Sequence, residues 1–254
     1  MFVSIMWGFM SETRSKIRLF VRSNLATDGI CELTPDHAHY LYNVMRQREG
    51  AQVGLFNGRD GEWRAEIISI NKNRCSLAVI VQTAPQGIPP DLWLLFAPIK
   101  KTRTDFIVEK AAELGCSRIR PIFTRNTNSE RLRIDRLQAH AIEAAEQCGE
   151  TSIAQVDPPM KLRDVFEGWN VDRRLMFCDE SRDAPPAQVA LRNADHGSWA
   201  ILIGPEGGFS QAEAEQIRSL PFVQPVTLGP RVLRADTAAV SAITLWQAFL
   251  GDWL

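Results

Sequence analysis

The spacing of apolar residues divides the chain into two regions with different predicted structures. In the first region, short apolar runs are separated by turn residues such as Asn57 to Gly61, and a short helix is predicted to open at Thr34. Several short strands at this spacing are typical of a small β-barrel. The strands are predicted at 17–22, 52–56, 63–70 and 75–81.

From residue 92 onward, apolar runs alternate with stretches of helical spacing. Strands are predicted at 92–97, 119–123, 175–178, 199–203 and 226–228, and helices at 105–114, 135–148, 211–220 and 237–249. This alternation predicts an α/β fold, in which helices cover both faces of a parallel sheet.

The segment between the two regions is rich in proline and glycine and reads as a linker at 85–90. We therefore expect a β-barrel domain at 17–84 and a parallel-sheet domain at 91–254. Residues 1–16 form an extension that we expect to be poorly ordered. Its opening is apolar but lacks a basic start and is too short to span a bilayer, so neither secretion nor a membrane partner is predicted.

Charge and cysteine content narrow the function only slightly. The net charge is −1, but residues 99–136 carry ten basic residues against five acidic ones. A solvated helix face explains this excess more simply than a polyanion footprint. The five cysteines are scattered and include no C-x-x-C pair, which predicts neither disulfides nor a metal site and fits a reducing cytoplasm.

Two glycine loops near the end of the chain are the candidate ligand site. The first follows an apolar run and contains Gly204, Gly207 and Gly208; Ser210 and Glu213 then have the spacing of a capping box. The second contains Gly229 and precedes the last helix. Glycine loops at the carboxyl ends of neighbouring strands are where α/β sheets bind small ligands. The alternative is a pair of tight turns without a ligand.

Charged residues beside these loops suggest possible chemistry. Arg231 and Arg234 could hold a phosphate or a developing oxyanion, or could simply pair with surface carboxylates. Asp236 stands where an N-cap is expected, with Thr237 as the other candidate, and capping is a simpler role for Asp236 than catalysis. Glu206 is expected to cap its own loop. The four histidines show no ligand spacing.

Taken together, the motifs resemble the RsmE family of SPOUT methyltransferases. The resemblance rests on Ile203 to Ser210 with Glu213, on Leu228 to Arg234 with Thr237 and Ala238, and on matching stretches at 18–21, 39–50, 110–121 and 146–149. It covers nearly the whole chain after about residue 16. Two positions depart from the family pattern: Asp236 stands where Glu is frequent, and Glu150 stands where Arg is common.

The resemblance implies a specific activity and architecture. Members of the family transfer the methyl group of S-adenosylmethionine to N3 of a uridine in 16S ribosomal RNA, as homodimers. The fold implied is a parallel-sheet SPOUT domain with a deep trefoil knot, preceded by a PUA-like RNA-binding barrel. An RNA-binding protein with a vestigial knot, and an α/β enzyme that uses the first loop as a phosphate site, are the alternatives.

The resemblance, together with the chemistry of the side chains, suggests roles for particular residues. Expected catalytic residues are Arg231, Arg234 and Asp236. Expected cofactor-binding residues are Leu202, Ile203, Gly204, Pro205, Glu206, Gly207, Gly208, Leu228, Gly229, Val232, Leu233, Arg234 and Thr237. Expected RNA contacts are Arg18, Arg46, Lys100, Lys101, Arg103 and Arg125, and no metal ligand is expected.

Overall fold

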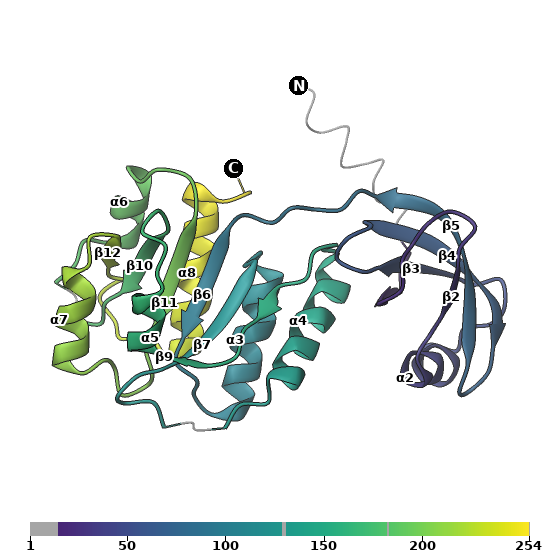
Figure 1. The fold of residues 1–254 in the computed structure, drawn as a ribbon, viewed down its shortest axis with the longest axis horizontal. Helices are drawn as coiled ribbons and strands as arrows, with labels where there is room; N and C mark the ends of the chain where they lie inside the picture. Colours follow the sequence, from purple (N-terminus) through teal and green to yellow (C-terminus); the bar gives the residue numbers. More distant parts are fainter. Residues whose placement is uncertain (1–14, 129–130, 182, 254) are drawn as a thin grey trace. The chain divides into compact units, whose positions relative to one another are not determined.

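The computed structural model describes residues 15–128, 131–181 and 183–253. All of the predicted extension except residues 15 and 16 therefore lies outside the described residues. The chain divides into two compact units, separated between Ile88 and Pro89 (Figure 1). The second unit is interrupted once, because the segment Ala145–Ser152, which we call the inserted segment, belongs to the first unit.

The first unit is built on a five-stranded sheet with the order β1-β3-β4-β5-β2. Its strands are β1 (Arg18–Phe20), β2 (Ile30–Glu32), β3 (Gln52–Phe56), β4 (Glu62–Ile70) and β5 (Cys75–Ala84). Helix α2 (Pro35–His39) opens at Thr34, whose hydroxyl accepts a hydrogen bond from the His37 N–H, as the sequence predicted. A π-helical turn, η1 (Tyr40–Val44), follows it.

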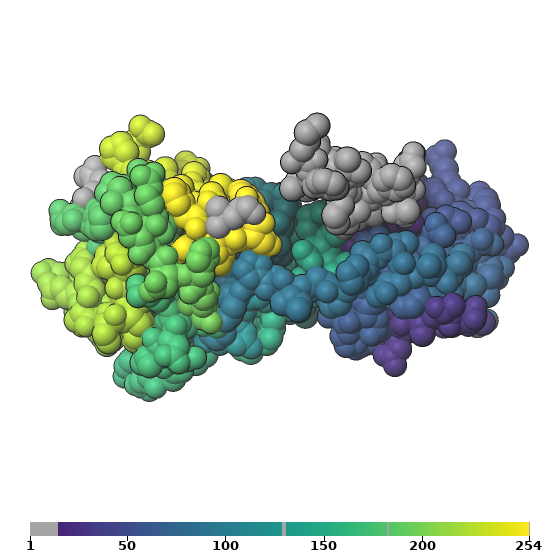
Figure 2. All heavy atoms as spheres, turned by 90° about the horizontal axis from the view of Figure 1, so that it is seen from above, coloured from purple at the N-terminus to yellow at the C-terminus, as the bar shows by residue number. Residues whose placement is uncertain are grey.

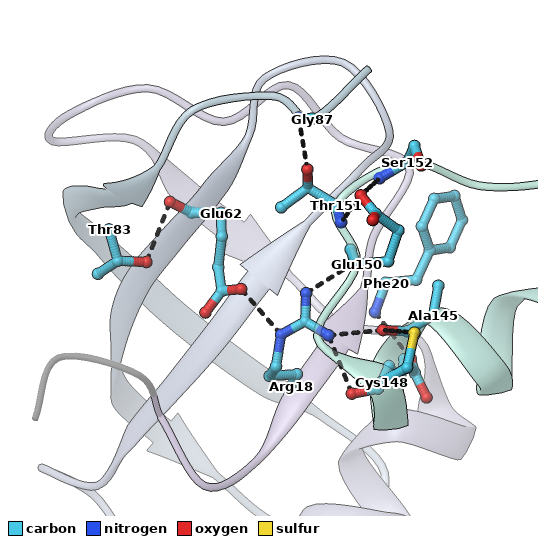
Figure 3. Close-up of polar contacts among 11 residues, drawn as sticks. Arg18, Phe20, Glu62, Thr83, Gly87, Ala145, Cys148, Glu150, Thr151 and Ser152 are labelled. Atoms are coloured by element: carbon cyan, nitrogen blue, oxygen red, sulfur yellow. Dashed lines mark hydrogen bonds and ion pairs between the residues drawn. The ribbon is translucent and has the colours of Figure 1, made fainter. Parts of the chain in front are cut away.

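Arg18 of β1 fastens the inserted segment to this sheet (Figure 3). Its guanidinium group donates to the main-chain oxygens of Ala145, Glu146 and Glu150 at 2.6, 2.9 and 2.8 Å, and its Nε pairs with Glu62 at 2.8 Å. The side chains of Arg18 and Glu62 are only 6% and 1% exposed. Arg18 therefore joins parts of the chain that are far apart in sequence, and its guanidinium group is almost completely shielded from solvent.

The second unit contains a parallel sheet with the order β12-β10-β11-β6-β7-β8, and β9 pairs with β7 beside it. The predicted α/β fold with a parallel sheet is thus confirmed. The strands are β6 (Leu92–Phe96), β7 (Arg118–Phe123), β8 (Gln155–Val156), β9 (Met160–Lys161), β10 (Arg174–Cys178), β11 (Trp199–Ile203) and β12 (Val223–Val226).

Helices cover both faces of this sheet. One face packs against α3 (Lys101–Glu113), α4 (Ile134–Cys148), α6 (Ala187–Arg192) and α8 (Ala235–Leu250). The opposite face packs against α5 (Leu162–Glu167) and α7 (Gln211–Ser219). The carboxyl-terminal part of the chain, coloured yellow in Figure 2, reaches the surface of the second unit, where Trp253 after α8 is exposed.

Several predicted boundaries need correction, among them those of α3, α8 and the last strand. Helix α3 begins at Lys101 and α8 at Ala235, so both start earlier than predicted. The last strand is Val223–Val226 rather than 226–228. Pro225 disguises this strand in the sequence, but proline is tolerated there because β12 lies at the edge of the sheet.

Candidate active site

A pocket of about 350 Å³ lies at the carboxyl ends of β10 and β11, where both glycine loops meet. Parallel α/β sheets bind ligands at this edge. The pocket is lined by Cys178, Asp179, Glu180, Ile203, Gly204, Pro205, Glu206, Phe209, Thr227, Leu228, Gly229, Arg231, Val232, Leu233, Arg234, Ala235 and Ala238. The two loops that the sequence singled out therefore form one cavity.

The first loop connects β11 to α7 and is closed by the predicted capping box. Ser210 accepts from the Glu213 N–H, and the Glu213 carboxylate accepts from the Ser210 N–H, so the capping-box prediction is confirmed. Gly208 has a φ of +65°, a left-handed conformation that favours glycine. Gly204 is needed for space, since a Cβ there would lie 2.6 Å from the Phe209 ring.

A neighbouring loop, after β7, supports the first loop from outside. The Asn126 side-chain amide donates to the main-chain oxygens of Gly207 and Gly208, each at 3.1 Å. The Arg125 N–H donates to Glu213 at 2.8 Å. No sequence pattern indicated the Asn126 contact, because a single Asn in a loop has no distinctive pattern.

The second loop connects β12 to α8 and contains Gly229, whose φ is +115°. The N-cap position of α8 is Arg234, whose side chain makes no capping hydrogen bond. Our prediction of an N-cap at Asp236 or Thr237 was therefore wrong. Asp236 instead lies within the first turn, where its carboxylate accepts from the Thr237 N–H at 2.8 Å and faces the positive end of the helix dipole.

The charged residues of the two loops are held differently. Arg231 and Arg234 are exposed and line the pocket, and in the described part of the chain no hydrogen bond or ion pair engages their guanidinium groups. Glu206 pairs with Arg103 at 2.7 Å instead of capping its own loop. Arg103 also approaches Asp236 at 3.7 Å.

Most, but not all, of the predicted cofactor residues line the pocket. Those outside its lining are Leu202, Gly207, Gly208 and Thr237, and the catalytic candidate Asp236 also lies outside it. Lining residues that sequence reasoning missed include Cys178, the last residue of β10, and Asp179 and Glu180, which follow it. An apolar strand ending in acidic residues at the same sheet edge was the available signal.

Asp179 is a buried carboxylate whose partners keep it ionised. Arg218 of α7 binds both of its oxygens, at 2.6 and 2.9 Å, and the Ser181 N–H donates to one of them. Burial acts to raise the pKa of Asp179, but these hydrogen bonds outweigh it, so the pKa lies below its usual range. Burial also raises the pKa of the Cys178 thiol, which makes that group a poor nucleophile at neutral pH.

The predicted RNA contacts fall into three groups. Arg46, Lys100, Lys101 and Arg125 are exposed. Arg103 is half-buried and paired with carboxylates. Arg18 does not fit the prediction of a phosphate contact, because its side chain is buried and its donors are used within the first unit.

Metal and membrane features can be assessed in the described residues only. No group of three His, Cys, Asp or Glu side chains there is arranged to hold a metal ion. Within the same residues, no helix has both the length and the apolar character needed to cross a membrane.

Comparison with known proteins identifies the class of this fold and pocket. Residues 87–247 match the family model of an RNA methyltransferase domain, and residues 33–80 match that of an RNA methyltransferase PUA domain. The protein is thus an RNA methyltransferase by class. Ribosomal RNA small subunit methyltransferase E of Rickettsia conorii is 30% identical over 228 residues, which cover 89% of this chain and 93% of that protein.

Its counterpart from Buchnera aphidicola (subsp. Schizaphis graminum) is 27% identical over 92% of this chain and 97% of that protein. The chain belongs to the family of ribosomal RNA small subunit methyltransferase E, which confirms the resemblance seen in the sequence.

Solved structures agree with this assignment. A Legionella pneumophila methyltransferase in complex with S-adenosylmethionine superposes with a TM-score of 0.83 at 27% identity, covering 94% of this chain and 99% of that one. The Neisseria gonorrhoeae ribosomal RNA small subunit methyltransferase E bound to S-adenosylmethionine gives a TM-score of 0.80 at 27% identity, covering 94% of this chain and all of the other.

Proposed function

We propose that this protein transfers the methyl group of S-adenosylmethionine to N3 of a uridine in 16S ribosomal RNA. The observation that carries the proposal is the single cavity formed by both glycine loops, in a chain whose relatives are named for this class of reaction. Two structures of similar fold hold S-adenosylmethionine, which supports the same cofactor here.

The pocket suits a ligand with apolar and polar parts. Its volume of about 350 Å³ lies within the range of small-molecule sites. Ile203, Leu228 and Leu233 provide apolar walls, while Gly204 and Gly229 expose main-chain groups. A Cβ added at Gly229 would meet no atom within 4 Å, so there is open space beside the second loop.

Two kinds of side chain in this protein would act on the uridine: an arginine that stabilises negative charge and a carboxylate that accepts a proton. When bound, S-adenosylmethionine supplies an electrophilic methyl group on a sulfonium. Uridine N3 becomes a good nucleophile only as its proton leaves, which places negative charge on O2 and O4. We assign Arg231 or Arg234 to stabilise that charge, because both residues line the pocket and neither guanidinium group has a carboxylate partner in the described chain. Asp236 is the candidate to accept the proton.

The remaining family features belong to the same proposal. Residues 17–84 would form the PUA-like RNA-binding domain, 85–90 the linker and 91–254 the SPOUT domain with its trefoil knot. The enzyme would work as a cytoplasmic homodimer, on RNA within the small ribosomal subunit. Exposed Arg46, Lys100, Lys101 and Arg125 are the proposed phosphate contacts.

Calorimetric titration with S-adenosylmethionine, with ATP as the control, tests the cofactor site. We expect binding of the methyl donor alone, and its loss in Gly204→Val. Binding of ATP instead would indicate a phosphate site and reject the proposal, and binding of neither would leave the RNA-binding alternative.

The target base is tested by mass spectrometry of 16S ribosomal RNA after incubation with the enzyme and the methyl donor. We expect one N3-methyluridine. Arg234→Ala should lose turnover at saturating donor and RNA; full turnover in that variant would remove Arg234 from the chemistry.

A further inference from the structure

Arg103 connects the first glycine loop to the start of α8, the helix that the second glycine loop precedes. It lies in the first turn of α3, which follows β6 at the same edge of the sheet as the pocket. Its Nη1 is 2.7 Å from Glu206 in the first loop, and its Nε is 3.7 Å from Asp236 in the first turn of α8. One side chain thus bridges two segments that must keep a fixed spacing if the cavity is to keep its shape.

The helix turn that carries Arg103 is itself anchored. The adjacent Thr104 is buried, and its hydroxyl accepts from the Ile99 N–H at 3.1 Å and donates to the Ile99 main-chain oxygen at 3.0 Å. These two bonds fix the start of α3 to the segment that connects it to β6. Arg103 therefore projects from a rigid base, whereas Glu206 lies in a loop.

The chemistry of the guanidinium group suits this bridge. Arginine carries donors in a rigid planar fork and can hold two carboxylates in fixed directions at once, which the single ammonium of lysine cannot do as well. The bridge places one positive charge between two negative ones. A phosphate that bound Arg103 would have to replace Glu206 and Asp236 as its partners. It would then lie close to both carboxylates, and the repulsion between like charges is unfavourable.

We propose that Arg103 is a positioning residue that sets the spacing of the two pocket loops, and thereby the affinity for the methyl donor, rather than an RNA contact. The proposal rests on the proposed function for the identity of the ligand. It also replaces our expectation, from the sequence, that Arg103 binds phosphate.

Donor affinity is the first test. The side chains of Arg103, Glu206 and Asp236 are 29%, 46% and 19% exposed, and partly exposed ion pairs are weak. Arg103→Ala should therefore raise the dissociation constant for S-adenosylmethionine about two- to fivefold. The dissociation constant of Arg103→Lys should lie between those of the wild type and Arg103→Ala. Arg163→Ala is the matched control, because Arg163 of α5 also pairs with two carboxylates, Asp164 and Glu167, but lies outside the pocket lining.

A double-variant comparison identifies the route. If Arg103 acts through the first loop, Glu206→Gln should weaken donor binding by itself, and adding Arg103→Ala should cost less than in the wild-type background. Fully additive effects would remove Glu206 from the mechanism and overturn the bridge.

RNA binding separates the two roles of Arg103. If it contacts phosphate, Arg103→Ala will leave donor affinity unchanged, weaken RNA affinity and reduce the salt dependence by about one counterion. That result would overturn the proposal.

Hydrogen exchange of the ligand-free protein keeps the test independent of the proposed function. Arg103→Ala should accelerate amide exchange in 204–209 and 235–238, whether or not the wild type binds S-adenosylmethionine; unchanged exchange in both segments would refute the positioning role. Failure of the wild type to bind the donor would instead refute the proposed cofactor.

Discussion

The absence of a side chain at Gly204 should be a steric requirement of the first loop. A Cβ at this position would lie 2.6, 3.0 and 3.2 Å from three carbons of the Phe209 ring, well inside the 3.5–4.0 Å at which carbon atoms pack best. The ring cannot retreat freely, because it packs edge-on against buried Phe177 with ring centroids 5.3 Å apart. We expect Gly204→Ala to lower the free energy of unfolding by about 1–3 kcal/mol, the usual cost of overpacking.

The same loop contains a control for this substitution. At Gly207 an added Cβ would meet its nearest atom, Cβ of Asn126, at an ordinary 3.5 Å, and φ at Gly207 is not positive. Gly207→Ala should therefore change the unfolding free energy by less than about 0.5 kcal/mol. Urea denaturation of the wild type and both variants, followed by circular dichroism, measures the difference.

A third variant checks the cause. If the Phe209 ring is the obstacle, Gly204→Ala should cost at least about 1 kcal/mol less in a Phe209→Ala background than alone. Equal stability of the Gly204 and Gly207 variants, or strict additivity with Phe209→Ala, would show that the contact between Gly204 and the ring does not constrain the loop.

Two further predictions concern buried charges. Arg18→Ala should lower the unfolding free energy by about 3–5 kcal/mol, because it leaves the Glu62 carboxylate buried and unpaired; calorimetry will show this, with exposed Arg22→Ala as the control. Arg218→Ala should cost about 1–3 kcal/mol at pH 7 by removing both hydrogen bonds to Asp179. Since the pKa of Asp179 is depressed in the folded protein, this contribution is present above its unfolded pKa of about 3.9 and is lost as pH falls through the folded value. The cost measured by urea titration should thus shrink below about pH 4, and a cost that persists there would contradict the assignment.

Sequence periodicity was sufficient for the long elements of the second unit. The strand at Trp199–Ile203 was predicted with the correct bounds, and α4 begins one residue earlier than predicted. Both consist of uninterrupted patterns, in which each residue supports the same assignment. The two-residue strands β8 and β9 were missed because they are too short to have a period.

The site was predictable where its chemistry is local. The glycine loops and the capping box at Ser210 are contiguous motifs, so the sequence alone indicated them. Arg103 and Glu206 are 103 positions apart, Arg18 and Ala145 are 127 apart, and Arg18 and Glu62 are 44 apart, and nothing in the local sequence reveals such partners. Both arginines therefore appeared to be free cations, whereas the fold pairs both with carboxylates.

The inserted segment has a consequence for the order in which the protein is made. Strands β1 to β5 leave the ribosome early, yet the main-chain oxygens that Arg18 binds are not synthesised until residue 150. Until then, Arg18 can pair with Glu62 but lacks the main-chain acceptors of the inserted segment. The amino-terminal unit therefore cannot be completed from its own contiguous sequence, and a fragment ending at Ile88 should be less stable than the same unit in the whole chain. The last contacts of Arg18 can form only after residue 150 has been synthesised, when Pro89–Ala144 of the second unit has already been translated.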